Sequence, residues 1–160
     1  MNDNVPMTPR GYELLKEELN QLKTVDRPAN VRDIETALEH GDLSENAEYH
    51  AAKEQQGFIE GRISELEAHL SSAEIIDIRT LPGTGRVVFG TTVDLSNVET
   101  AEEVRYQIVG ELEADISRGL VSVTSPIARA LIGKEEGDVA VVLAPGGREI
   151  EYEILAVEFV

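Results

Sequence analysis

Apolar residues recur at intervals of three and four along two stretches of the first half of the chain. The members of the first stretch are Tyr12, Leu15, Leu19, Leu22, Val31, Ile34 and Leu38. Those of the second stretch are Ile59, Ile63, Leu66, Leu70 and Ala73. This spacing places the apolar side chains on one narrow face of each helix, as in a coiled coil. Because only a short connection joins the two stretches, the pattern predicts two helices folded back on each other as an antiparallel hairpin.

The first helical stretch carries signals for a start, an interruption and an end. Thr8 followed by Pro9 is typical of a helix start, with a capping hydroxyl before a proline at the first helical position. Pro28 has no backbone N–H to donate, so we expect a kink or a break near Thr24. His40-Gly41 is typical of a last turn, because glycine tolerates a positive φ.

After Ile78 the pattern changes to short β-rich runs, which cover residues 87–89, 93–95, 106–109, 121–123, 139–143 and 149–155. Between them, Ser125-Pro126 opens a short helix. The chain is therefore predicted to be an α+β protein. It combines an antiparallel coiled-coil domain over residues 1–78 with a compact β-rich domain over residues 79–160, and the stretch RTLPGTG, residues 79–85, is the predicted linker.

Composition narrows the classes of function. The formal net charge is −17, from 31 acidic and 14 basic side chains, so the chain lacks the surplus of Lys and Arg that free nucleic acid binding requires. A partner with a positive surface fits this charge, although solubility alone explains it equally well. There is no cysteine, no signal peptide pattern and no long apolar run, so we expect a cytoplasmic protein without a membrane segment.

Two carboxylates, Asp42 and Glu45, lie in the bend between the predicted helices. Their spacing matches a capping box, in which Asp42 would cap the second helix and Glu45 would reach back to the N–H of Asp42. The same spacing suits a shared metal, because Mg²⁺ often takes one or two carboxylates and completes its shell with water or phosphate. Two acids on an exposed bend make a poor metal site alone, but they could complete one that a partner already holds. Both interpretations stay open at this point.

Three stretches of the chain resemble the Gre family of bacterial transcript cleavage factors. They are HGDLSENAEYHAAKEQQGF at residues 40–58, SPIARALIGKEEGD at residues 125–138, and PGG with EIEYEIL near the end. The similarity runs from residue 6 nearly to the C-terminus. It implies that the β-rich domain is FKBP-like and docks on bacterial RNA polymerase, while the coiled coil enters the polymerase's secondary channel. The implied function is to stimulate the polymerase's intrinsic cleavage of backtracked RNA, which rescues arrested complexes.

The resemblance also assigns roles to residues at the bend. The family's two catalytic acids correspond to Asp42 and Glu45, which would share Mg²⁺ with the polymerase. No cofactor bound by the isolated protein and no independent nuclease activity are implied. Lys53 matches a position that contacts the RNA 3′ end in some members, and Tyr49 borders the acids. Leu38 stands where certain members have arginine, which weakens the expectation of RNA contact. We expect a monomer.

Each of these side chains also has a simpler interpretation. From the residues alone, Lys53 is a solvated helix position and Tyr49 a seam residue. His40 and His50 flank the bend, but they lie on different arms without a second histidine at i+4, so zinc is disfavoured. Two other functions compete with transcript cleavage. One is a non-catalytic inhibitor that occupies the same channel, which the stretch DLSEN disfavours, and the other is a prolyl isomerase or chaperone, which the scarcity of aromatic residues after residue 78 disfavours.

Overall fold

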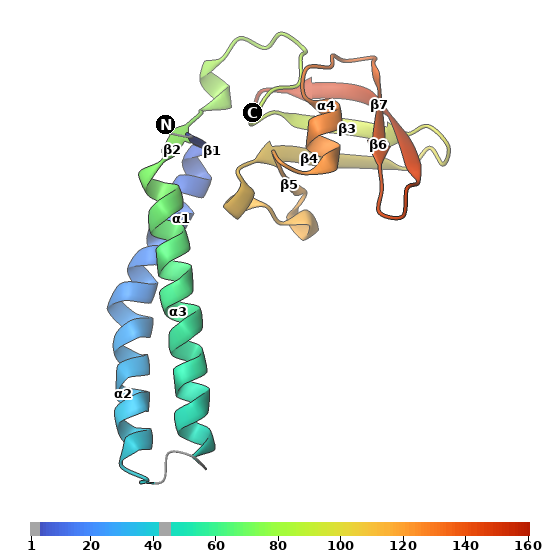
Figure 1. Cartoon of the computed structure of the whole chain (residues 1–160). Coiled ribbons are helices and arrows are strands. Elements are labelled where there is room, and N and C mark those ends of the chain that lie inside the picture. Colours follow the sequence, from blue (N-terminus) through green and yellow to red (C-terminus); the bar gives the residue numbers. More distant parts are fainter. Residues whose placement is uncertain (1–3, 42–45) are drawn as a thin grey trace. The chain divides into compact units, whose positions relative to one another are not determined.

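The computed structural model describes residues 4–41 and 46–160, so Asp42 and Glu45 lie outside the described residues. Contacts divide the described chain into a helical unit, Tyr12–Ala73, and a second unit formed by Asn4–Gly11 together with Glu74–Val160 (Figure 1). The predicted α+β class, with a helical hairpin followed by a β-rich domain, is confirmed. The division falls between Ala73 and Glu74 rather than at Ile78, and the N-terminal segment groups with the second unit. Whether residues 1–78 and 79–160 fold separately stays a prediction.

The helical unit consists of two antiparallel arms. The first arm contains α1 (Pro9–Gln21), a π-helical turn (Leu22–Asp26) and α2 (Arg27–Leu38), and the second arm is α3 (Ala47–Ser71). The predicted start of α1 is confirmed, since the hydroxyl of Thr8 accepts a hydrogen bond from the N–H of Gly11 at 3.0 Å. Figure 1 shows α2 and α3 lying side by side.

The predicted irregularity near Thr24 is a π turn, and the helix continues through it. The N–H of Arg27 donates to the carbonyl of Leu22, five residues earlier, and Pro28 follows in the first turn of α2. A π turn holds one residue more than an α-helical turn, so it rotates the face of the helix that comes after it. Because of this rotation, α2 presents a different set of side chains to α3 than uninterrupted periodicity would.

The seam between the arms confirms one predicted stripe and corrects the other. In α3, Ile59, Ile63 and Leu66 are buried as predicted. In α2, the prediction that Val31 and Leu38 lie in the seam is wrong, because their side chains are 44% and 45% exposed. The predicted seam residue Ile34 is half-buried, and the buried residues beside it are Asn30 and Ala37. A heptad repeat continued without interruption from Leu15 and Leu22 would reach positions 29 and 36, and the extra residue of the π turn moves it to Asn30 and Ala37.

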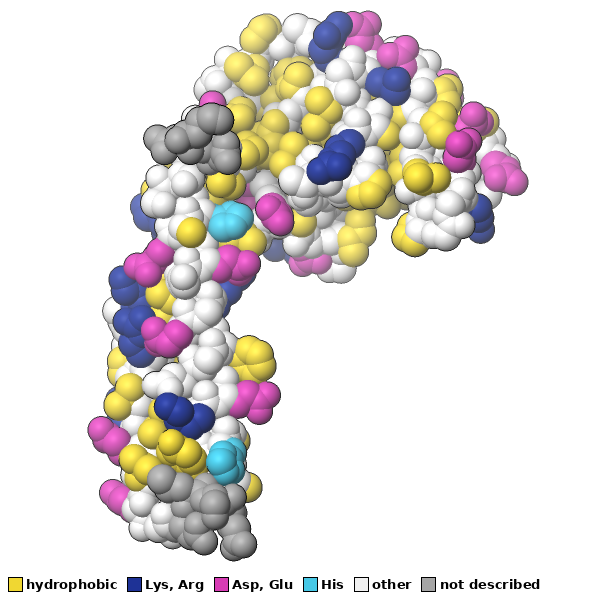
Figure 2. Space-filling model, viewed as in Figure 1, with side chains coloured by type: hydrophobic (Ala, Val, Ile, Leu, Met, Phe, Trp, Pro, Cys, Tyr) yellow, Lys and Arg dark blue, Asp and Glu magenta, His cyan; other side chains and the backbone are white. Residues whose placement is uncertain are grey.

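Ion pairs connect the arms on either side of this seam. The pairs are Lys23 with Glu67 at 3.2 Å, Arg27 with Glu60 at 2.8 Å and Arg62 with Glu18 at 2.6 Å. The hydrogen bonds from Arg27 hold the pKa of the Glu60 carboxyl below its ordinary value. Exposed pairs of this kind contribute little to stability, so their main effect is on the register of the arms. On the face seen in Figure 2, acidic side chains lie beside basic ones along the hairpin.

The second unit contains a sheet with the strand order β5-β4-β3-β7-β6. Its strands are β3 (Thr92–Asn97), β4 (Glu103–Val109), β5 (Leu120–Ser122), β6 (Val139–Leu143) and β7 (Glu149–Glu158). All neighbours are antiparallel except β4 and β5, which are parallel. A separate pair joins β1 (Val5–Met7) to β2 (Ala73–Ile75), and the short helix is α4 (Pro126–Leu131), capped by Ser125 as predicted.

One predicted strand of this unit is wrong. Residues 87–89 form no strand, although Val87 is completely buried in the core. Its N–H donates to the carbonyl of Lys134 at 2.8 Å, and its carbonyl accepts from the N–H of Gly133 at 2.9 Å. The backbone of Val87 is therefore bonded to the turn after α4 and not to a neighbouring strand. The core around it includes Leu95 and Leu131.

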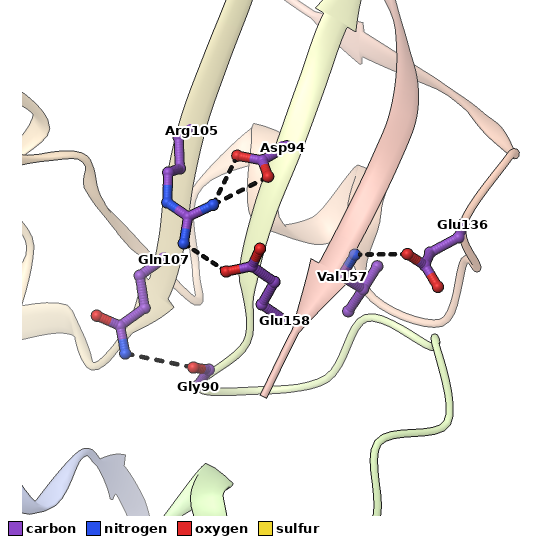
Figure 3. A network of polar contacts seen from close by, with 7 residues as sticks. All are labelled: Gly90, Asp94, Arg105, Gln107, Glu136, Val157 and Glu158. Atoms are coloured by element: carbon purple, nitrogen blue, oxygen red, sulfur yellow. Dashed lines mark hydrogen bonds and ion pairs between the residues drawn. The ribbon is translucent and has the colours of Figure 1, made fainter. Parts of the chain in front are cut away.

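The outer face of the sheet carries a polar network (Figure 3). Arg105 of β4 donates to both carboxylate oxygens of Asp94 on β3, each at 2.9 Å, and also to Glu158 on β7. The guanidinium holds the pKa of Glu158 below its ordinary value. These contacts connect the three central strands across their exposed face.

Residues 4–11 are held in the second unit by Glu113. Its carboxylate accepts hydrogen bonds from the N–H of Gly110 at 2.8 Å, from the N–H of Thr8 at 3.1 Å and from the Thr8 hydroxyl. A Cβ at Gly11 would lie within 1.8 Å of the same carboxylate, so a larger residue there would displace Glu113 from its hydrogen bonds. Within the described residues, no helix is both long and apolar enough to cross a membrane.

The exposed segment between Ile78 and Arg86 should be the first site of limited proteolysis, because few of its backbone groups are protected. We expect trypsin to cut after Arg79 and to leave two folded fragments. Since residues 4–11 are bonded to Glu113, the fragments should co-elute in native buffer and separate in urea. First cuts inside α3 or inside the sheet would contradict this boundary.

Candidate functional site

The bend begins with a tight turn at the end of α2. The N–H of His40 donates to the carbonyl of Ala37 at 3.1 Å, and that of Gly41 donates to Leu38 at 3.2 Å. Gly41 has a φ of +93°, which confirms the predicted role of His40-Gly41 as a last turn. The chain thus leaves the first arm at a defined place, directly before Asp42.

The second arm begins at Ala47, and its cap is Asn46. The Oδ1 atom of Asn46 accepts a hydrogen bond from the N–H of Tyr49 at 3.0 Å. The capping-box interpretation, in which Asp42 caps the second helix with Glu45, is therefore wrong for α3. The helix starts after both acids, so its first turn is capped without either of them.

Asn46 also contacts the other arm. Its Nδ2 atom donates to the carbonyl of Ala37, in the last turn of α2, at 2.7 Å. One amide therefore satisfies an N–H at the start of α3 and a C=O at the end of α2. Asn46 was not among the residues selected from the sequence, although asparagine is one of the strongest N-cap residues and stands directly before the helical pattern.

Tyr49 and Lys53, the predicted RNA contacts, lie one turn apart on α3. Tyr49 is half-buried and its ring packs edge-on against His50, with 5.6 Å between the ring centroids. Lys53 is exposed, and its ammonium donates to Oε1 of Gln56 at 2.8 Å. Within the described residues, Lys53 forms no ion pair. Its charge is therefore available at the surface of the hairpin.

Helical spacing shows which side of the hairpin carries these residues. Lys53 and Glu60 are seven residues apart, so they share a face of α3, and Glu60 pairs with Arg27 of α2. Leu38 lies eleven residues after Arg27, about three turns along the same face of the first arm. The side marked by the Arg27–Glu60 pair thus carries the predicted RNA contacts together with the exposed Leu38. We call this the lysine side.

The opposite side is hollowed into an open groove. Its walls include Asp33 and Thr36 from α2 and Glu48 and Gln55 from α3. Its charged lining residues, Asp33 and Glu48, are both acidic, and alanines from both helices line the rest of it together with uncharged polar side chains. It provides no attraction for a phosphate backbone.

The two histidines at the bend have separate surroundings. His40 Nδ1 lies 3.6 Å from a carboxylate oxygen of Glu48, whereas His50 packs against Tyr49. Among the described residues, no group of three or more His, Asp or Glu side chains is arranged to hold a metal ion. Any metal at the bend would depend on Asp42 and Glu45, whose carboxylates suit Mg²⁺ by chemistry and which lie outside the described residues.

Comparison with known proteins decides the family. A family model described as transcription elongation factor, N-terminal, matches residues 5–75, and one described as transcription elongation factor, GreA/GreB, C-term, matches residues 82–159. The chain belongs to the GreA/GreB family of transcription elongation factors. This confirms the resemblance to the Gre family that three stretches of the sequence indicated. The role of the chain is in transcription elongation.

Curated relatives agree over almost the whole length. Transcription elongation factor GreA of Thioalkalivibrio sulfidiphilus is 64% identical over 155 residues, which cover 97% of this chain and 98% of the relative. GreA of Yersinia pestis is 61% identical over 156 residues, covering 98% of both chains. Among solved structures, the GreA factor homolog 1 protein of Thermus thermophilus matches 98% of this chain and 99% of its own at 29% identity, with a TM-score of 0.43.

The new assignment of the cap predicts a difference in stability between substitutions at the bend. Asn46→Ala removes the cap and should lower the free energy of unfolding by about 1 kcal/mol. Asp42→Ala and Glu45→Ala should each cost less than ~0.5 kcal/mol, because α3 is capped without them. Urea unfolding followed by helix circular dichroism measures the three changes. A loss at Asp42 as large as that at Asn46 would restore Asp42 as the cap.

Proposed function

We propose that this chain binds RNA polymerase, inserts its helical hairpin into the secondary channel and stimulates the polymerase's own hydrolysis of backtracked RNA. The second unit docks on the polymerase, and the bend of the hairpin reaches the active site. Asp42 and Glu45 act there as catalytic residues. Because the polymerase supplies the active site and holds the RNA, the chain has no nuclease activity of its own. It acts as a monomer in the cytoplasm.

One observation supports the role of the acids most directly. Asn46 caps α3, so the first turn of that helix does not depend on Asp42 or Glu45 for its cap. Acidic side chains in the connection between two helices, where the helix cap is another residue, are candidates for contact with a partner. The arms deliver them, and the seam and the ion pairs hold the arms together.

Charge supports a site that is shared with the polymerase. A chain with a net charge of −17 gains little from free RNA, but it can approach a positively charged channel. Asp42 and Glu45 would hold Mg²⁺ together with polymerase groups, since two carboxylates leave most of its octahedral shell to other ligands. When bound, Mg²⁺ supplies Lewis acidity and lowers the pKa of a water molecule. The carboxylates orient the ion and compensate its charge.

The lysine side is the part of the hairpin that faces the RNA 3′ end in this proposal. Lys53 supplies a positive charge for a phosphate, and Tyr49 packs at the border of the bend. Leu38 lies on the same side, exposed, where a basic residue would add a second contact. This chain therefore grips RNA with a single lysine there, and its contact is weaker than that of members with arginine.

Conservative substitution of the acids separates chemistry from folding. Asp42→Asn with Glu45→Gln removes both charges and keeps the size of the side chains. We expect the double variant to fold and to compete for polymerase as the original chain does, while stimulated cleavage in backtracked complexes falls at least ~100-fold. Cleavage rate, melting temperature and competition binding are the observables. Full cleavage by a folded, polymerase-bound double variant would remove Asp42 and Glu45 from the mechanism.

The isolated chain should neither cleave RNA nor bind it appreciably. Its acidic balance leaves no surface that neutralises a run of phosphates. The measurement is incubation of end-labelled RNA with Mg²⁺ and the chain, with and without polymerase. RNA products that form without polymerase and persist after further purification would contradict the assignment of the active site to the polymerase.

A further inference from the structure

The ends of the two arms are joined through a single side chain. Oδ1 of Asn46 accepts from the N–H of Tyr49 at 3.0 Å, and Nδ2 of Asn46 donates to the carbonyl of Ala37 at 2.7 Å. Ala37 is itself buried in the seam, with 2% of its surface exposed, and its carbonyl also accepts from the N–H of His40. The contact therefore lies where the first arm ends, where the second begins and at the base of residues 42–45.

Few other side chains could make both contacts. Serine and aspartate cap a helix about as well as asparagine, but an ionised aspartate has no donor for the carbonyl of Ala37. Serine would have to make both contacts through the one oxygen of a shorter side chain, whereas asparagine uses two separate atoms. An aspartate would also place a carboxylate against the carbonyl of Ala37. Glutamine has the donor, but it is not among the preferred capping residues. The two partners also fix the orientation of the amide, since Tyr49 needs an acceptor and Ala37 a donor.

We propose that Asn46 is a positioning residue for stimulated cleavage, which clamps the end of α2 to the start of α3 so that Asp42 and Glu45 extend from a fixed base. This inference rests on the proposed function above. Metal-assisted hydrolysis depends steeply on geometry, and a misplacement of about 1 Å can cost about 100-fold in rate. If the end of α2 and the start of α3 moved apart, the two carboxylates would move relative to the polymerase groups with which they share Mg²⁺. Asn46 itself touches neither RNA nor metal in this account.

The hairpin offers a matched control with the same chemistry. Asn30, 4% exposed in the seam, donates through Nδ2 to the carbonyl of Ala52 at 2.9 Å. It also joins the arms through an asparagine amide, but two turns of α2 farther from the bend. Asn30→Ala should weaken the hairpin without moving the base of residues 42–45. This variant therefore separates the effect of a less stable hairpin from the effect of misplacing Asp42 and Glu45.

The experiment compares Asn46→Ser, Asn46→Asp and Asn30→Ala in the full-length chain. At saturating factor, we expect the maximal rate of stimulated cleavage to fall about 10-fold in Asn46→Ser and further in Asn46→Asp, and the Mg²⁺ concentration for half-maximal rate to rise. Polymerase binding should stay within about twofold for both. Asn30→Ala should lower the melting temperature and leave the rate within about twofold. Because serine and aspartate cap equally well, a purely structural role predicts no difference between the two Asn46 variants.

A second readout needs no polymerase. Spin labels at the exposed positions Glu39 and Ala47 report the separation of the arm ends in the isolated chain. Their distance distribution should broaden in Asn46→Ser and stay narrow in Asn30→Ala. An unchanged distribution in Asn46→Ser would overturn the clamp.

The outcomes distinguish this inference from the proposed function. If the original chain does not stimulate cleavage, the proposed function and the positioning role of Asn46 are both overturned. If it does, and Asp42→Asn with Glu45→Gln abolishes the effect while both Asn46 variants remain fully active, only the positioning role falls. Equal losses of rate in the Asn46 variants and in Asn30→Ala would also overturn it, because stability alone would then explain the loss.

Discussion

The hairpin depends on a seam that is only one or two side chains wide. In α3 it is a regular stripe of isoleucine and leucine, whereas in α2 it contains Asn30 and Ala37 and little apolar volume. So narrow a seam needs additional constraints on register, because small side chains tolerate sliding. The amide bonds of Asn30 and Asn46 to carbonyls of the opposite arm provide them, together with the inter-arm ion pairs. The contact between Asn46 and Ala37 and the arrangement of the lysine side both depend on that register.

Sequence periodicity predicted the arms well where one helix runs without interruption. It failed at Val31 and Leu38, which are apolar but lie one position after the inward-facing Asn30 and Ala37. The inward face itself is set by a π turn that has no distinctive sequence signal and that moves the repeat by one residue. The sequence pattern also favoured Asp42 over Asn46 as the cap, since both are strong caps when judged locally. The bond that decides between them reaches Ala37 on the other arm, and local patterns do not contain such contacts. The strand expected at residues 87–89 failed for a similar reason, because long-range bonds to the turn after α4 shape that segment.

Folding and chemistry are assigned to different residues in this account. The seam, the caps and the ion pairs are all formed by described residues, and none of them requires a carboxylate at position 42 or 45. The proposed function accounts for such a division, since the polymerase would then hold the RNA and share the metal. The strongly acidic composition fits a chain that approaches a positive channel and does not grip nucleic acid by itself. Under that proposal the chain positions the two carboxylates, and Lys53 is the exposed positive charge on its lysine side.

The most direct test of delivery is to locate the bend while the chain is bound. Fe²⁺ can replace Mg²⁺ in the active site of a polymerase stalled on backtracked RNA, and the radicals that it generates cut nearby polypeptide. With this chain end-labelled and bound, the account predicts backbone cuts confined to the bend, around residues 41–46, that disappear when excess Mg²⁺ displaces the iron. Cuts that fall instead in the second unit or far along the arms, or a bound chain that is not cut at all, would contradict delivery of the acids to the active site.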